Sequence, residues 1–466
     1  MRKKIIVFIT ALFLPLFYSS ASAEITFEQH LVDTLFNHAF DVQGVDLDGD
    51  GDTDILGAAF IGDEIAWWKQ DSVGEFTKYI IDDSFDGAYS VCTFDLDGDN
   101  DLDIIGAAGD GDEISWWEND GGQIFTKHII DTTFNGAYNV CAVDMNHDDY
   151  VDIVACAYHG DQAAWWENNG DYEFEKHLID GEFDGAVFVD AVDLNNDGYI
   201  DIVGTAYFGD EVAWWENDGL QQFTRHALVD TFTNARGLCV TDMDYDTDLD
   251  IIAASVELDA VVLWLNDGTT NFAEIIVDTT FNGAADICAA DLDGDDDMDI
   301  IGAGFWSNSI SYWENDGVMS FTRHPVSSNF NGAIRVASAD INGDNKIDIL
   351  GAASYGNTIS WWENSPEVFV NEDPPSSLPS GIQLYPAYPN PFNSSTSIGF
   401  ELANAGPVSI AIYNLQGQRV ETLLNKQMIS GRHNIAWDAK GISSGIYFYH
   451  LTSNGNTLSR PVTLLK

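Results

Sequence analysis

Acidic stretches recur along this chain at a fixed interval of 49 residues. The first is DLDGDGDTDI at residues 46–55, and the second, DLDGDNDLDI, begins at Asp95. Five more begin at Asp144, Asp193, Asp242, Asp291 and Asp340. A strict period of about 40 to 50 residues is typical of a repeat architecture and takes priority over any local interpretation. The sequence therefore contains seven copies of one structural unit.

Each unit has the pattern of four short strands. In the second unit, strand-forming residues occupy 88–96, 103–109, 113–119 and 124–130, and turn residues lie between them. Four short strands joined by tight turns form one antiparallel sheet. Seven such sheets around an axis form a β-propeller. We therefore expect an all-β fold whose main part is a seven-bladed β-propeller with four-stranded blades.

Aromatic residues support a closed ring. A fourth-strand Phe recurs from Phe76 to Phe321, and the copy missing from the last unit is found at Phe27, one period before Phe76. The N-terminal strand is therefore expected to complete the seventh blade. A Trp occupies one phase of every unit, and the position before it is Trp in five of the seven. Because adjacent strand residues point to opposite faces, we expect each aromatic pair to fill the gaps to both neighbouring blades. A sugar-stacking surface is the alternative.

Composition divides the chain into four parts. Residues 1–23 have a basic start, an apolar run of 14 residues and a small-residue end, which is the pattern of a secretory signal peptide. A membrane span needs about 20 apolar residues, so no transmembrane segment is expected in the mature chain. Residues 24–364 contain the repeats, 365–382 are a Pro- and Ser-rich linker, and 383–466 form a second domain.

The acidic stretches have the composition of cation-binding loops. Positions 1, 3, 5 and 9 of each nine-residue loop are Asp or Asn, and these loops contain 31 of the 74 Asp and Glu in residues 24–375. Alternate side chains of a tight turn converge on one point, and position 7 would add its backbone carbonyl. Ca²⁺ takes about six to eight oxygen ligands, whereas Mg²⁺ requires stricter geometry. We predict up to seven Ca²⁺ ions; solvated acidic turns are the alternative.

The predicted calcium ligands occupy positions 1, 3, 5, 7 and 9 of the seven loops. They are Asp46, Asp48, Asp50, Asp52 and Asp54; Asp95, Asp97, Asp99, Asp101 and Asp103; Asp144, Asn146, Asp148, Tyr150 and Asp152; Asp193, Asn195, Asp197, Tyr199 and Asp201; Asp242, Asp244, Asp246, Asp248 and Asp250; Asp291, Asp293, Asp295, Asp297 and Asp299; and Asp340, Asn342, Asp344, Lys346 and Asp348.

The loop pattern D-x-[DN]-x-D-G-x-x-D resembles the calcium loops of FG-GAP and VCBS repeats, which include the propeller of integrin α-subunits. The resemblance extends over about residues 25–364 and implies a calcium-binding propeller. That family favours Gly at position 6, where this chain has only Gly51 and Gly198. Asn and Asp tolerate the left-handed backbone, but Thr247 is β-branched, so we expect the loop from Asp242 to bind calcium least well.

The C-terminal segment closely resembles the type A sorting domain of the type IX secretion system. The resemblance rests on YPAYPNPFNSSTSIGFEL, VSIAIYNLQGQRV, SGIYFYHL and the final LLK, and it covers residues 383–466. It implies a small β-sandwich that interacts with the type IX machinery and directs periplasmic cargo across the outer membrane. The domain is then usually removed, or the cargo is anchored to surface lipopolysaccharide. We therefore expect an extracellular or outer cell-surface protein.

The sequence offers little support for catalysis. There is no H-E-x-x-H, nucleophile elbow or P-loop, and we predict no catalytic residue. Residues 24–375 carry 9 Lys and Arg against 74 Asp and Glu, which excludes nucleic acid as a partner. A monomeric binding or adhesion module for an extracellular glycan or protein is the favoured interpretation. A carbohydrate-active enzyme resembling a polysaccharide lyase and a passive surface-layer protein are the alternatives.

A ligand is expected on the face opposite the acidic loops, where equivalent positions of the units vary most. The predicted ligand residues are Arg236, Arg335, Tyr89, Tyr138 and Trp306. The two arginines lie near the start of a first strand, at positions where the other units have no basic residue. Lys69 and Lys346, by contrast, are assigned to turns on the calcium face. Arg binds carboxylates and sulfates through a forked pair of donors, so an anionic glycan or acidic peptide is predicted. Pairing of the arginines with Asp41 or Asp286 is the alternative.

Overall fold

The structure is a computed structural model. It describes residues 25–366 except 171, and residues 382–464 except 389–391, 393–394, 403–404, 415–417, 429–430 and 454–455. The predicted signal peptide and most of the predicted linker lie outside the described residues. The chain divides into two compact units, one within residues 1–368 and the other within 369–466. In the described part, no helix is long and apolar enough to cross a membrane.

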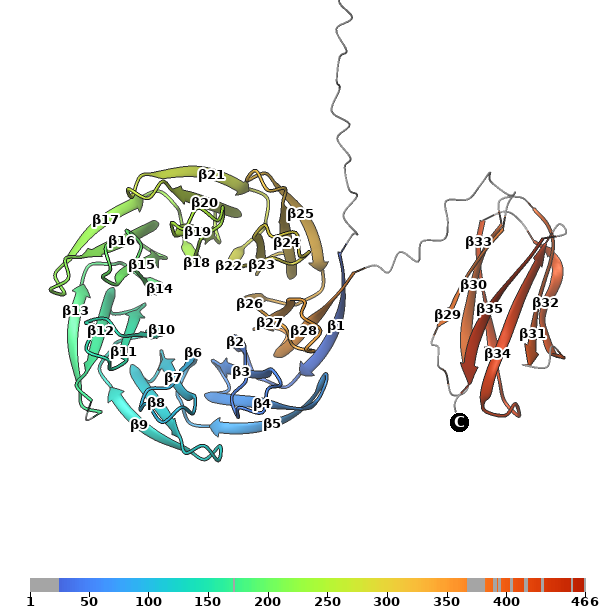
Figure 1. The fold of residues 1–466 in the computed structure, drawn as a ribbon, viewed down its shortest axis with the longest axis horizontal. Helices are drawn as coiled ribbons and strands as arrows, with labels where there is room; N and C mark the ends of the chain where they lie inside the picture. Colours follow the sequence, from blue (N-terminus) through green and yellow to red (C-terminus); the bar gives the residue numbers. More distant parts are fainter. Residues whose placement is uncertain are drawn as a thin grey trace, which may run out of the picture. The chain divides into compact units, whose positions relative to one another are not determined.

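The first unit consists of seven four-stranded sheets, which form a ring of blades (Figure 1). Blade 1 contains β2 (Ala39–Val45), β3 (Asp54–Ala59), β4 (Glu64–Ser72) and β5 (Glu75–Asp82); blade 2, β6 (Ala88–Phe94), β7 (Asp103–Ala108), β8 (Glu113–Asn119) and β9 (Phe125–Asp131); blade 3, β10 (Ala137–Val143), β11 (Asp152–Ala157), β12 (Gln162–Asn168) and β13 (Phe174–Asp180); blade 4, β14 (Ala186–Val192), β15 (Asp201–Ala206), β16 (Glu211–Asn217) and β17 (Phe223–Val229). Blade 5 contains β18 (Ala235–Thr241), β19 (Asp250–Ser255), β20 (Ala260–Asn266) and β21 (Phe272–Asp278); blade 6, β22 (Ala284–Ala290), β23 (Asp299–Gly304), β24 (Ser309–Asn315) and β25 (Phe321–Ser327); blade 7, β26 (Ala333–Ala339), β27 (Asp348–Ala353), β28 (Thr358–Pro366) and β1 (Ile25–Asp33).

Blade 7 joins the two ends of the ring. Its strand order is β1-β28-β27-β26, so its outer strand comes from the start of the described chain and its other three from the end of the repeats. In the antiparallel pair of β1 and β28, Ile25 lies opposite Pro366 and Phe27 opposite Asn364. Figure 1 shows the dark blue β1 beside the orange β28. The predicted closure of the ring by the N-terminal strand is confirmed.

The core of the propeller lies between its blades. Trp68 belongs to a buried cluster that also contains Trp361 of blade 7, whereas Trp67 packs in a second cluster with Trp117 of blade 2. The fourteen side chains at these paired positions are at most 4 % exposed. The ring of Phe36 meets Trp68 edge to face at 4.8 Å. The aromatic pairs therefore fill both gaps of each blade, as predicted, and form no sugar-binding surface.

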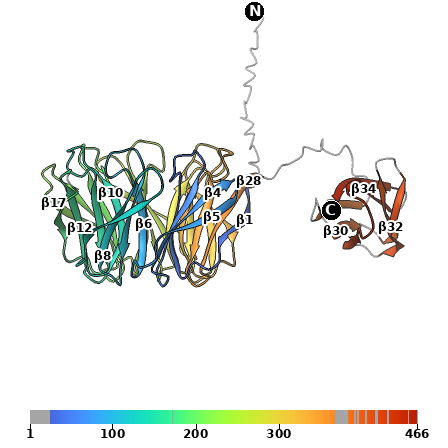
Figure 2. The ribbon, with the colours of Figure 1, turned by 90° about the horizontal axis from the view of Figure 1, so that it is seen from below.

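Antiparallel pairing places the connections of each blade on two faces of the ring (Figure 2). The acidic loop joins the first strand to the second, and it lies at the same end as the turn between the third and fourth strands; we name this the acidic face. The turn between the second and third strands and the crossing to the next blade lie on the opposite face. The first strands line the central channel, so their starts surround the channel mouth on the opposite face (Figure 1).

The second unit is a β-sandwich. One sheet has the order β29-β30-β33, formed by Ile382–Tyr388, Ser395–Leu402 and Gly431–Asp438. The other has the order β32-β31-β34-β35, formed by Arg419–Met428, Gly406–Asn414, Gly445–Ser453 and Asn456–Leu464. Phe400 of the first sheet and Ile410 and Tyr449 of the second belong to one fully buried core cluster. The predicted small C-terminal β-sandwich is confirmed.

Candidate functional site

Each acidic loop is shaped by hydrogen bonds between its own backbone and its carboxylates. In all seven loops, the N–H of position 6 donates to the carboxylate of position 1 at 2.8–3.2 Å. The N–H of position 7 donates to the side-chain oxygen of position 5 at 2.9–3.1 Å. Position 6 has φ between 64° and 93°, and Thr247 adopts this left-handed conformation with φ 82°. The weaker binding expected for its loop stays a prediction.

The carboxylates at positions 1, 3 and 5 converge in four of the loops. One oxygen from each of the three side chains lies within 4.8 Å of the others in the sets Asp46, Asp48 and Asp50; Asp95, Asp97 and Asp99; Asp242, Asp244 and Asp246; and Asp291, Asp293 and Asp295. The other three loops have Asn at position 3, and the amides of Asn146 and Asn195 donate to the position-5 carboxylates at 3.1 and 3.2 Å. These oxygen ligands fit a hard cation such as Ca²⁺.

Position 9 has a structural role that the sequence reasoning missed. Asp152 is fully buried; its Oδ2 accepts the N–H of Met145 at 3.0 Å and its Oδ1 that of Asn168 at 2.8 Å. The same two bonds occur in every blade. Burial raises the pKa of Asp152 to about 7, although the two hydrogen bonds lower it. This carboxylate joins the start of the loop to the third strand, and its predicted contact with calcium stays a prediction.

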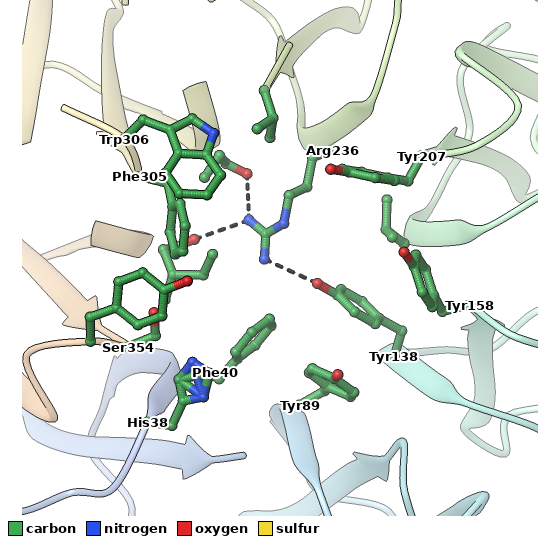
Figure 3. Close-up of a pocket in the computed structure, with 15 residues that line it drawn as sticks. His38, Phe40, Tyr89, Tyr138, Tyr158, Tyr207, Arg236, Phe305, Trp306 and Ser354 are labelled. Atoms are coloured by element: carbon green, nitrogen blue, oxygen red, sulfur yellow. Dashed lines mark hydrogen bonds between the residues drawn. The ribbon is translucent and has the colours of Figure 1, made fainter. Parts of the chain in front are cut away.

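On the opposite face, the channel mouth widens into an aromatic pocket of about 270 Å³ (Figure 3). Tyr89 and Tyr138 enter it from first strands, and Tyr158 and Trp306 from turns between second and third strands. Trp306 is 55 % exposed and forms part of the rim. We name this cavity the mouth pocket. It presents ring faces and hydroxyl groups toward solvent.

Arg236 places a positive charge in the mouth pocket (Figure 3). Its side chain is 9 % exposed; Nη1 donates to the carbonyls of Ala285 at 2.6 Å and Ile334 at 3.1 Å, and Nη2 donates to the Tyr138 hydroxyl at 3.2 Å. The guanidinium also lies over the ring of Phe40, 5.4 Å from its centroid. Among the described residues, no carboxylate forms an ion pair with Arg236, so its hydrogen-bond partners are neutral.

Arg335 does not line the mouth pocket, but it lines a smaller cavity in the channel together with Arg236, Tyr89 and Tyr138. Its Nε donates to Asp41 at 2.8 Å, and its Nη1 lies 3.5 Å from Asp286. Both carboxylates are almost completely buried, at 3 % and 1 % exposed. The structure therefore brings Arg236 together with Tyr89, Tyr138 and Trp306, whereas Arg335 forms the carboxylate pairs that the sequence left open as an alternative.

Part of the pocket wall was not among the predicted residues. Tyr158, Tyr207 and Phe305 line the pocket from one repeating turn position, directly before the position of Trp306. The available signal was that four of the seven units have an aromatic residue at that position, namely Phe60, Tyr158, Tyr207 and Phe305. His38 also lines the pocket and stacks on Tyr355, with ring centroids 5.9 Å apart. Burial lowers the pKa of His38.

Comparison with solved structures finds remote likenesses, including these three. A fungal alcohol oxidase of the AA5 family in complex with copper has a TM-score of 0.48 at 9 % identity, covering 96 % of this chain and 100 % of that one. PorZ, a surface component of the type IX secretion system of Porphyromonas gingivalis, has a TM-score of 0.44 at 12 % identity, covering 89 % of this chain and 58 % of that one. A functionally unknown protein of Desulfotomaculum acetoxidans has a TM-score of 0.45 at 9 % identity, covering 66 % and 98 %. No curated protein matches the chain.

Family comparisons cover most of the chain. An FG-GAP-like repeat matches six overlapping segments in steps of one period, 46–106, 95–155, 144–204, 193–253, 242–302 and 291–351. A secretion system C-terminal sorting domain matches residues 386–464. That domain indicates export by type IX secretion to the cell surface or the extracellular space. The chain therefore belongs to the FG-GAP-like repeat proteins and ends in a type IX sorting domain.

Proposed function

We propose that this chain is a calcium-stabilised, non-catalytic binding module that binds an acidic extracellular glycan end-on at the channel mouth. The observation that carries the proposal is Arg236, a nearly buried guanidinium with neutral partners inside an aromatic pocket. Arg has five N–H donors, and three of them are engaged in the bonds described. The remaining donors are available to a carboxylate or sulfate, which Arg binds more strongly than neutral acceptors.

The wall of the mouth pocket suits a sugar ring. Aromatic faces at the rim supply stacking surface, and burial raises the pKa of Tyr158 to about 12, so its hydroxyl stays protonated and can donate. A volume of about 270 Å³ lies just below the range of about 300–1,000 Å³ that is usual for pockets of drug-sized ligands. The pocket therefore suits one terminal residue of a chain better than an internal stretch of polymer.

Calcium is assigned to the acidic face. The side chains at positions 1, 3 and 5 of the loops would hold it, with the backbone carbonyl of position 7. When bound, the ion neutralises carboxylates that otherwise repel one another at short range. In four of the loops the three carboxylate oxygens already lie within 4.8 Å of one another, which reduces the ordering needed on binding.

Substitution in the mouth pocket is expected to weaken glycan binding. Arg236→Gln removes a charge-assisted hydrogen bond, and a loss of about 1.5–3 kcal/mol corresponds to at least about a tenfold rise in Kd. Trp306→Ala is expected to raise Kd several-fold, because an aromatic ring contributes contact area at low entropic cost. Kd would be measured for uronate-terminated, sulfated and neutral oligosaccharides in millimolar Ca²⁺.

Ile61→Ala is the matched control for this test, because Ile61 is 58 % exposed on the same face and does not line the pocket. It should bind like the wild type. If both pocket variants bind an acidic glycan as tightly as the wild type, the site lies elsewhere. Shortening of the polymer during the assay would instead support an enzyme.

Removal of the sorting domain is expected to stop export. A chain that ends at residue 375 retains all seven blades and should accumulate, folded, in the periplasm of the native host. The full chain should reach the cell surface or the medium. Fractionation followed by immunoblotting measures this, and a surface-exposed truncated chain would contradict the role of the tail.

A further inference from the structure

Lys69 makes the first acidic loop different from the others. Its ammonium contacts the Asp48 carboxylate and lies 2.7 Å from Oδ2 of Asp50, so it bridges positions 3 and 5 of the loop. Lys69 lies within strand β4, which corrects its assignment to a turn. Its side chain is 25 % exposed, and that of Asp48 is 7 % exposed. A cation is therefore already present between positions 3 and 5 of this loop, whereas Oδ1 of Asp46, at position 1, is buried and accepts no hydrogen bond from any described residue.

The equivalent residue in other blades carries the opposite charge. It is Glu118, Glu167, Glu216, Glu314 or Glu363 in five blades and Leu265 in blade 5. Each of the five glutamates pairs with a histidine of the fourth strand at 2.7–3.2 Å. Blade 1 has Tyr79 at the histidine position, and blade 5 has Ile275. The Glu and the His are thus present or absent together.

In blades 1 and 3, the side chain at this position reaches the acidic loop of its own blade. In blade 3, Oε1 of Glu167 accepts a hydrogen bond from Nδ2 of Asn146, at position 3 of the loop, at 3.2 Å. In blade 1, Lys69 reaches the same loop position. The residue after the Trp pair therefore places a negative charge beside the loop of blade 3 and a positive charge inside the first loop.

We propose that the Lys69 ammonium, by occupying positions 3 and 5, takes the place of calcium in the loop from Asp46, so that the propeller binds at most six ions. This inference rests on the calcium part of the proposed function. Ca²⁺ binds oxygens at about 2.3–2.6 Å, so an ion held by Asp48 and Asp50 would lie beside the ammonium and be repelled by it. Lys346 differs, because it contacts only Asp344, at 2.6 Å.

Calcium stoichiometry tests the proposal. Equilibrium dialysis of the purified full chain, followed by metal analysis, should give one more ion for Lys69→Gln than for the wild type. Val73→Glu is the control: it makes the same change in net charge on the acidic face, at a turn position that is 65 % exposed, and should leave the number of ions unchanged. Equal numbers for Lys69→Gln and the wild type would overturn the proposal.

A second pair of variants leaves Lys69 in place. Asp48→Ala should not change the number of bound ions, whereas Asp97→Ala, which removes the ligand oxygen at position 3 of the next loop, should lower it by one. Addition of EGTA should speed hydrogen exchange in residues 95–103 but not in residues 46–54. Equal losses for the two variants would overturn the proposal. A wild type with seven ions would overturn this inference alone, and one with none would overturn calcium binding as well.

Discussion

Chelation of calcium is expected to lower the melting temperature of the propeller by at least about 10 °C. An ion that binds only the folded state at a hundred times its Kd adds about 2.7 kcal/mol for each site. One kcal/mol shifts the melting temperature of a domain of about 150–250 residues by about 2–4 °C, and a larger domain by less. Several loops together therefore give a large shift, which calorimetry in millimolar Ca²⁺ and in EGTA would measure.

Magnesium provides the control for this measurement. Mg²⁺ at the same concentration in EGTA should restore little of the lost stability, because its octahedral geometry is stricter and it keeps more of its water. Identical melting curves with and without calcium would contradict a structural role for the ion.

Asp152→Ala is expected to destabilise the propeller in calcium and in chelator alike. The substitution leaves the buried N–H groups of Met145 and Asn168 without their acceptor. Each unsatisfied buried donor costs about 1–3 kcal/mol, so the free energy of unfolding should fall by about 2–6 kcal/mol. Chemical denaturation in EGTA measures this effect in the absence of any metal contribution.

Asp148→Ala is the matched variant from the same loop. Asp148 is exposed at position 5, and among the backbone donors that the structure describes its carboxylate accepts only the N–H of Tyr150, in its own turn. It should lower stability in calcium and change it little in EGTA. Equal effects of both variants in EGTA would show that position 9 has no structural role of its own.

The repeating features of the fold could be predicted because each occurs several times. The ring, its closure by the N-terminal strand and the packing of the aromatic pairs depend on residue types held in one phase. Periodicity could not show that Arg236 and Arg335 have different partners. A register shift occurs near the start of each first strand, between Ala235 and Leu238 in blade 5 and between Ala333 and Arg335 in blade 7. Such irregularities change the direction in which side chains point, so adjacent positions of a first strand place their side chains at different depths in the channel.

The contacts that a single side chain makes could not be predicted from the sequence either. Position 9 has the same residue type as the other acidic positions, and only its burial shows that it binds backbone N–H groups. The four-carbon side chain of Lys69 can take many directions, and the sequence does not say which carboxylates it reaches. Periodicity therefore predicts which residues are equivalent. Register shifts of the backbone and the conformation of each side chain decide what that residue contacts.

The pairing of β1 with β28 also sets an order of events during synthesis. Thr26 bonds to Ser365, 339 positions later, whereas each of blades 1 to 6 uses consecutive strands. Six blades can assemble while the chain is being made, but the ring stays open until the last repeat has been made. Until then, it has unpaired strand edges that are prone to association. The sorting domain follows that repeat in the chain. A prematurely ended chain lacks both the strands that close the ring and the sorting domain, so we expect the same missing residues to leave the ring open and to prevent secretion.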